Sequence, residues 1–79
     1  MWIISQNGKE AVNSNNIALL KVEKEEHTVV AETYRTMIEL GAYQNSDHAE
    51  QVLKHIVKMM AMAKTEEPIK MPKIWPEKK

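Results

Sequence analysis

Apolar residues recur at every second position along the middle of the chain, which predicts β-strands. The clearest case is the run from Leu20 to Glu23, where apolar and charged residues alternate. A period of two is typical of a strand with one buried face. Residues 27–33 are rich in β-branched side chains, which favour strands. We therefore expect strands at three places: residues 17–24, 27–33 and 36–40.

Turn residues separate these runs and add a hairpin at the start of the chain. Asn7-Gly8 stands between the β-type runs 2–5 and 10–13, and Asn-Gly favours a type I′ turn because both residues accept positive φ. Glu25-Glu26 predicts a second reversal, and Gly41 predicts the end of the last strand. The pattern predicts a short antiparallel β-meander of four to five strands.

After residue 45 the apolar spacing changes to three and four, which predicts one long amphipathic helix over residues 46–64. Ser46 is expected to cap its first turn. The apolar stripe comprises Ala49, Val52, Leu53, Ile56, Met60 and Ala63, and Val57 and Met59 widen it. The predicted fold class is α+β, with the meander packed on this long C-terminal helix.

The last residues change character, because prolines at 68, 72 and 76 exclude a helix and favour an extended path. We expect residues 1–65 to form a small α+β domain and residues 66–79 to form an extended tail rich in Pro and Lys. The tail's apolar residues, Trp75 among them, leave three placements open. They would dock on a neighbouring subunit, fold back on the chain's own helix, or contact a ligand beside Lys70 and Lys73. Met59 and Met62 indicate that the helix end meets another chain or this tail.

Composition narrows the function classes. A chain of 79 residues has a marginal core, and without Cys it has no disulfides and no thiolate zinc site. We therefore expect a homo-oligomer, with a monomer of low stability as the alternative. The 11 basic and 11 acidic residues balance, which disfavours duplex nucleic acid as a partner. Neither a signal peptide nor a membrane-spanning run is recognisable, so we expect a cytoplasmic protein without membrane association.

Catalytic chemistry has little support in the sequence. The histidines, His27, His48 and His55, are spaced too widely for a shared metal ion and are expected at the surface. No glycine-rich phosphate loop is present, since the chain has only Gly8 and Gly41. We expect no enzyme activity and no cofactor.

Tyr34-Arg35 is the strongest candidate binding motif. An aromatic residue beside an Arg in a turn between strands can stack on a base and hold a phosphate, although an ordinary exposed turn has the same composition. Lys9 is a weaker phosphate contact. In the tail, Lys70, Lys73 and Trp75 complete the expected ligand-binding residues.

Three short motifs resemble a family of small, functionally uncharacterised proteins common in phages and prophages of Gram-positive bacteria. They are the opening Met-Trp-Ile-Ile-Ser-Gln-Asn-Gly, the stretch from Leu40 to Ser46 before the apolar helix positions, and Met71-Pro72. In this chain, residues 73–76 follow the Met-Pro motif as an extra segment. The resemblance implies a viral or prophage origin, and small phage proteins include inhibitors of host defence, some of which bind signalling nucleotides without cleaving them.

These observations favour a non-enzymatic binding protein of phage type that acts in the host cytoplasm. Its partner would be an anionic nucleotide signal or a host protein. The alternative is a structural adaptor whose tail mediates oligomerisation.

Overall fold

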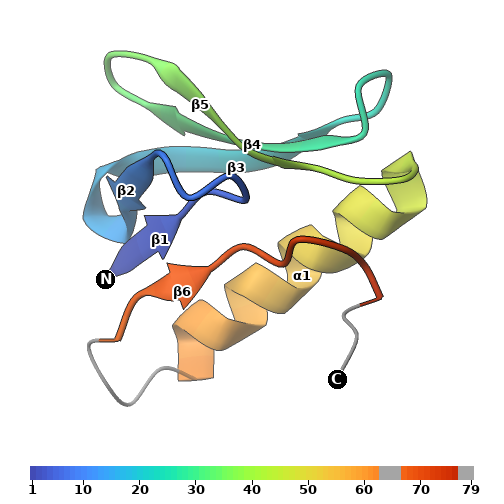
Figure 1. Ribbon diagram of the computed structural model, residues 1–79. Helices are drawn as coiled ribbons and strands as arrows, with labels where there is room; N and C mark the ends of the chain where they lie inside the picture. Colours follow the sequence, from blue (N-terminus) through green and yellow to red (C-terminus); the bar gives the residue numbers. More distant parts are fainter. Residues whose placement is uncertain (63–66, 77–79) are drawn as a thin grey trace.

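The computed structural model describes residues 1–62 and 67–76. In these residues the chain forms, in order, β1 (Trp2–Ile4), β2 (Ala11–Asn13), the 3-10 helix η1 (Ser14–Asn16), β3 (Ile17–Glu23), β4 (Thr28–Thr33), β5 (Met37–Ala42), α1 (Ser46–Met62) and β6 (Ile69–Lys70). The predicted α+β fold class is confirmed. The strands form two three-stranded sheets, β2-β1-β6 and β3-β4-β5, rather than one meander. Figure 1 shows α1 running beneath both sheets, with β6 between β1 and the helix.

The predicted first hairpin is present, with a wider loop than expected. β1 and β2 pair antiparallel, with Ile3 opposite Val12. Gly8 has a φ of 74°, whereas among the described non-glycine residues only His27 has a positive φ. Asn7 therefore does not form a type I′ turn. Its side chain instead accepts hydrogen bonds from the Ser5 hydroxyl at 2.7 Å and the Lys9 amide at 2.8 Å, which fix the loop.

The tail folds back on its own chain. β6 pairs parallel with β1, with Ile3 opposite Ile69 and Ile4 opposite Lys70. Ile69 and Met71 are buried in the core. Of the three placements left open for the tail's apolar residues, the described part shows the one within the same chain. Proline at 72 keeps this strand short because it cannot continue a ladder of backbone donors.

The second sheet departs from the prediction at Gly41. β5 continues through Gly41 to Ala42, so the expected strand end at Gly41 is wrong. The β4–β5 ladder contains an irregularity, because Val29 pairs with Gly41 and Val30 pairs with Glu39. Leu40 is therefore an extra residue on β5. A Cβ atom at Gly41 would lie 2.8 Å from the Tyr43 hydroxyl oxygen and 3.0 Å from its ring. Glycine is required at this position because the Tyr43 ring packs against the backbone.

Helix α1 begins at Ser46 as predicted, but its capping residue is Asn45. The Asn45 side-chain oxygen accepts a hydrogen bond from the His48 amide at 2.8 Å, which is the contact of an N-cap residue with the third residue of a helix. The expected cap at Ser46 is therefore wrong by one position. Ala49, Val52 and Ile56 are buried as predicted, and the expected helix positions 63 and 64 lie outside the described residues.

The predicted widening of the helix stripe is wrong. Val57 is 49% exposed and Met59 is 37% exposed. The sheets are narrow, so they cover only one side of the helix.

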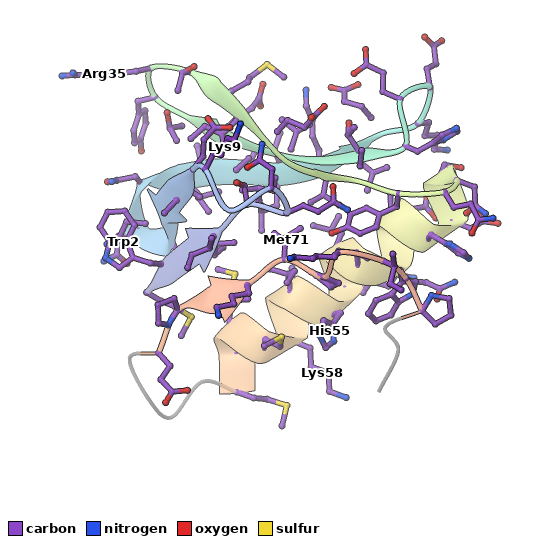
Figure 2. The ribbon with its side chains drawn as sticks, in the orientation of Figure 1. Trp2, Lys9, Arg35, His55, Lys58 and Met71 are labelled. Carbon is purple, nitrogen blue, oxygen red and sulfur yellow. The ribbon has the colours of Figure 1, made fainter. Side chains whose placement is uncertain are left out.

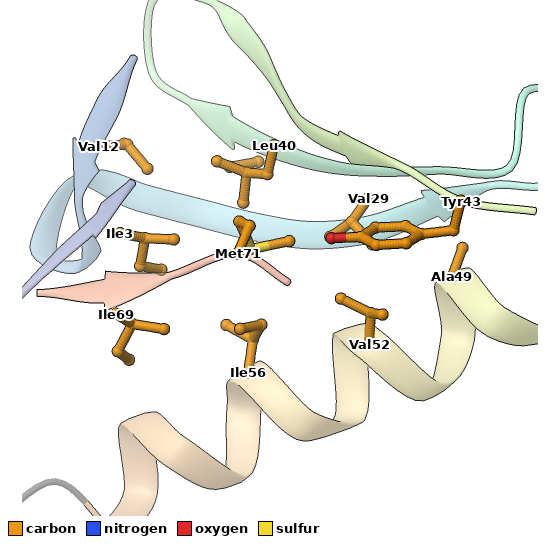
Figure 3. Packing of buried hydrophobic residues seen from close by; sticks show 11 residues of the cluster. Ile3, Val12, Val29, Leu40, Tyr43, Ala49, Val52, Ile56, Ile69 and Met71 are labelled. Atoms are coloured by element: carbon orange, nitrogen blue, oxygen red, sulfur yellow. The ribbon is translucent and has the colours of Figure 1, made fainter. Parts of the chain in front are cut away.

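The core draws on both sheets, the helix and the returning tail (Figure 3). The largest fully buried side chains are those of Ile3, Leu40, Ile56, Val29 and Val52. Full burial of one such side chain stabilises a fold by about 1.5–3 kcal/mol. Tyr43 joins this core with its polar end satisfied, since its hydroxyl donates to the Pro72 carbonyl at 2.7 Å. The two resemblance motifs around Tyr43 and Pro72 thus meet in one contact.

Replacing Gly41 with Ala should lower the free energy of unfolding by about 1–3 kcal/mol, because the new methyl group overlaps the Tyr43 ring. Urea denaturation followed by circular dichroism measures the change. A glycine in a strand without this contact would gain stability on substitution. A Gly41→Ala variant as stable as the parent would therefore contradict the close packing of Tyr43.

Burial raises the pKa of Tyr43 to about 12. The folded state favours the neutral phenol, so this contribution to stability is complete below the ordinary tyrosine pKa of about 10 and is lost as the pH rises towards 12. Urea unfolding across this alkaline range should show a steeper loss of stability for the parent than for Tyr43→Phe. Parallel pH profiles for the two proteins would contradict the assignment. A Tyr34→Phe background leaves Tyr43 as the one tyrosine for absorbance titration.

Candidate functional site

The turn that carries Tyr34 and Arg35 is held by the side chain of Thr33. The Thr33 hydroxyl oxygen accepts hydrogen bonds from the amides of Arg35 and Thr36, both at 3.2 Å. The Thr33 amide donates to the Thr36 carbonyl at 2.8 Å. A short threonine-bonded turn of this kind orders the backbone without glycine. The turn therefore presents Tyr34 and Arg35 at the tip of the second sheet.

A groove of about 420 Å³ lies between this tip and the first hairpin. We call it the aromatic groove. It is lined by Trp2, Ala11, Val12, Asn13, Asn16, Thr33, Tyr34, Arg35, Thr36 and Ile38. Tyr34 is 92% exposed and Trp2 is 49% exposed. Both indole and phenol rings are thus available to a ligand at this end of the molecule.

Strand alternation explains why Trp2 reaches the groove. Ile3 points into the core, so its neighbour Trp2 projects to the opposite face of the hairpin. Trp2 lies opposite Asn13 in the ladder, which brings an amide side chain beside the indole. Figure 2 shows Trp2 and Arg35 at the same end of the protein, with Arg35 extending outward from the turn. Sequence reasoning missed Trp2 and Asn13 as site residues. Strand alternation could have indicated Trp2, because it places Trp2 on the face opposite to Ile3.

The aromatic groove is positively charged. Arg35 is the one charged residue among those that line it. Arg35 also forms no ion pair with the residues that the structure describes. A guanidinium without a carboxylate neighbour is a natural partner for phosphate, because its planar donors match two phosphate oxygens.

The outer face of the second sheet has the opposite character. Lys21 lies 3.1 Å from a Glu23 carboxylate oxygen and 3.6 Å from one of Glu32. The hydrogen bond with Glu23 is the main cause that raises the pKa of Lys21. Glutamates 23, 25, 26 and 39 and one lysine, Lys24, also line a hollow near the β3–β4 turn. This acidic end disfavours anionic ligands, in contrast to the aromatic groove.

The structure does not bring the five expected ligand-binding residues together. Lys70 and Lys73 line a different cleft, beside the loop from Ser5 to Gly8. Trp75 packs on α1, where its indole nitrogen donates to the Gln51 side-chain oxygen at 2.8 Å. Its ring centroid also lies 5.3 Å from that of His55. Trp75 thus has a structural role in attaching the tail to the helix, while Tyr34 and Arg35 remain together.

Two further expectations concern the methionines and the histidines. Met59 and Met62 line a groove together with Pro68 and Ile69 of the tail, so the helix end faces the tail of its own chain.

Within residues 1–62 and 67–76, no three His, Asp or Glu side chains gather as a metal site would require. The ring nitrogens Nδ1 of His27 and His48 are buried and have no hydrogen-bond partner in that same part of the chain.

No family model, curated protein or solved structure matches this chain. No helix in the described residues is long and apolar enough to cross a membrane.

Thr33→Val should destabilise the protein by about 1 kcal/mol, because two turn amides lose their acceptor. Thr33→Ser retains the hydroxyl and should lie closer to the parent. Thermal or urea unfolding compares the three proteins. Equal stability of the Thr33→Val and Thr33→Ser variants would contradict a stabilising role of the Thr33 hydroxyl in the turn.

Proposed function

We propose that this chain is a non-enzymatic binding protein that sequesters a nucleotide in the aromatic groove. The observation that carries the proposal is the grouping of two accessible aromatic rings and an unpaired guanidinium, among the described residues, around one groove of about 420 Å³. A nucleotide combines a flat base with phosphate, and this groove offers a partner for each.

The base would stack on Tyr34, Trp2 or both. Stacking of a base on an aromatic side chain contributes about 1–3 kcal/mol. Tyr34 is almost fully exposed and makes little contact with its own protein, so a ligand would gain most of the ring surface.

The phosphate would bind Arg35, and amide and hydroxyl groups would bind the sugar or the base edges. Asn16 and Thr36 line the groove beside Arg35. Asn13 is partly engaged, because its side-chain oxygen accepts from the Asn15 amide at 3.0 Å, which leaves its amide nitrogen as a donor. Few polar groups set in a partly apolar groove are typical of small-ligand sites.

In a wider role, the protein would act as a phage-type inhibitor of host defence in the host cytoplasm, as a homo-oligomer that holds its signal without cleaving it. The family resemblance of the sequence motifs supports this role. A host protein as partner would use the same exposed rings. The adaptor alternative has less support, because Ile69 and Met71, which a tail would use to join subunits, are buried in the chain's own core.

The proposal predicts that Tyr34→Ala and Arg35→Gln each weaken nucleotide binding at least tenfold, since each removes one of the two main contacts. Isothermal titration calorimetry with AMP, ADP and ATP measures the affinity. Leu19→Ala and Lys24→Gln are controls outside the groove, as the first removes an exposed apolar side chain from β3 and the second removes an exposed cation from the β3–β4 turn. Both controls should bind as the parent does.

Native mass spectrometry of protein purified from its host identifies a retained ligand and the assembly mass together. A nucleotide released unchanged on denaturation would support sequestration. Nucleotide affinity that is unchanged in the Tyr34→Ala, Arg35→Gln double variant would exclude the aromatic groove as the binding site. Catalytic turnover of any bound nucleotide would contradict the non-enzymatic part of the proposal.

A further inference from the structure

A second cleft, of about 550 Å³, lies between the loop of the first hairpin and the returning tail. We call it the lysine cleft. Its lining comprises Ile4, Ser5, Gln6, Asn7, Gly8, Lys70, Met71 and Lys73. None of these is acidic, and the only charged side chains are the two lysines. The lysine cleft shares no lining residue with the aromatic groove.

The fold directs both lysines away from the core. Ile69 and Met71 are buried, so the intervening Lys70 must project to the other face of the strand. Lys70 lies opposite Ile4 in the parallel ladder, which places the two side chains on the same outer face. Lys73 follows buried Pro72 and is itself exposed.

Hydrogen bonds fix the backbone around both lysines. The Met71 amide donates to the Ile4 carbonyl at 3.0 Å, which anchors the residue next to Lys70. The Gln6 side-chain nitrogen donates to the Lys73 carbonyl at 2.9 Å. The cleft is thus built from two segments far apart in sequence, and their spacing does not depend on a ligand.

The polar groups at the cleft are arranged for an anion. Lys70 and Lys73 form no ion pair with any residue in the described ranges. The Asn7 side-chain oxygen is used by Ser5 and Lys9, so its amide nitrogen is the group left to donate. No atom lies within 4 Å of the position that a Cβ would occupy on Gly8, which leaves the loop backbone open to a ligand.

We propose that the lysine cleft binds a phosphate-class oxyanion between Lys70, Lys73 and the amide of Asn7. Charge-assisted hydrogen bonds from two ammonium groups would hold the anion, and the anion would relieve the repulsion between the two like charges. This site is separate from the aromatic groove, so it does not depend on the proposed nucleotide function. Its ligand is either a free oxyanion or the phosphate of a larger molecule.

Titration of ¹⁵N-labelled protein with inorganic pyrophosphate, followed by NMR, tests the proposal. The expected result is saturable shifts of the amide signals of Asn7, Gly8, Lys70 and Lys73. The Lys70→Gln, Lys73→Gln double variant should bind at least tenfold more weakly. Lys54→Gln, Lys58→Gln, a matched double variant of exposed helix lysines, should bind like the parent. Both variants should retain dispersed spectra, which shows that folding is intact.

Two further arms separate the sources of the anion and the two sites. If ADP shifts the same amide signals and binds the lysine cleft more tightly than pyrophosphate, the ligand is a phosphate-bearing molecule. If pyrophosphate binds more tightly than ADP, the ligand is a free oxyanion. In the Tyr34→Ala, Arg35→Gln variant, the amide signals of Asn7, Gly8, Lys70 and Lys73 should shift and saturate at the same pyrophosphate concentration as in the parent. Shifts that rise linearly without saturation, or equal affinity in the Lys70→Gln, Lys73→Gln variant, would overturn the proposal.

Discussion

The side chain of Gln6 hydrogen-bonds to both the second sheet and the returning tail, and its backbone belongs to the loop of the first hairpin. Its amide nitrogen donates to the carbonyls of Ala42 at 2.8 Å and Lys73 at 2.9 Å, and its oxygen accepts from the Ala42 amide at 3.0 Å. The Gln6 backbone amide donates to the Leu40 carbonyl at 2.7 Å. The Tyr43 hydroxyl adds one bond, to the Pro72 carbonyl at 2.7 Å. Apolar side chains, which set no register, form most of the remaining contact between the sheets. These directional bonds therefore determine how the sheets and the tail are placed relative to one another.

Both candidate sites depend on this placement. The aromatic groove needs the first hairpin beside the β4–β5 turn, because Trp2 comes from one and Tyr34 from the other. The lysine cleft needs the Ser5–Gly8 loop beside β6. Arg35 lines the first of these sites and Lys70 and Lys73 line the second, whereas glutamates 23, 25, 26 and 39 line the hollow near the β3–β4 turn together with Lys24. The formal net charge of zero therefore does not describe the charge at either candidate site.

Much of the fold could be predicted from local sequence pattern. The alternation around Leu20 and the stripe from Ala49 to Ile56 located strands and helix, because burial of one face dictates both patterns. The cap was misplaced by one residue because Asn45 and Ser46 are both good capping residues. Glycine at 41 predicts a strand end from local sequence alone, whereas its role in the fold is to admit the ring of Tyr43. The parallel pairing of β6 was not predictable, since no local pattern reports a partner at the far end of the chain. The expected site residues were chosen by residue type and not by position in the fold. They therefore lie in three separate places in the structure.

The pairing of Ile3 with Ile69 has a consequence for the order of folding. During synthesis the first hairpin leaves the ribosome long before its third strand exists, and an isolated hairpin is at best marginally stable in water. In the meander from β3 to β5 and the helix that follows it, residues in contact are closer together in the sequence. Contacts of short sequence separation form sooner. The nascent chain should therefore assemble from its middle outward. Ile3 and Ile4 would then be among the last residues to reach all their native partners.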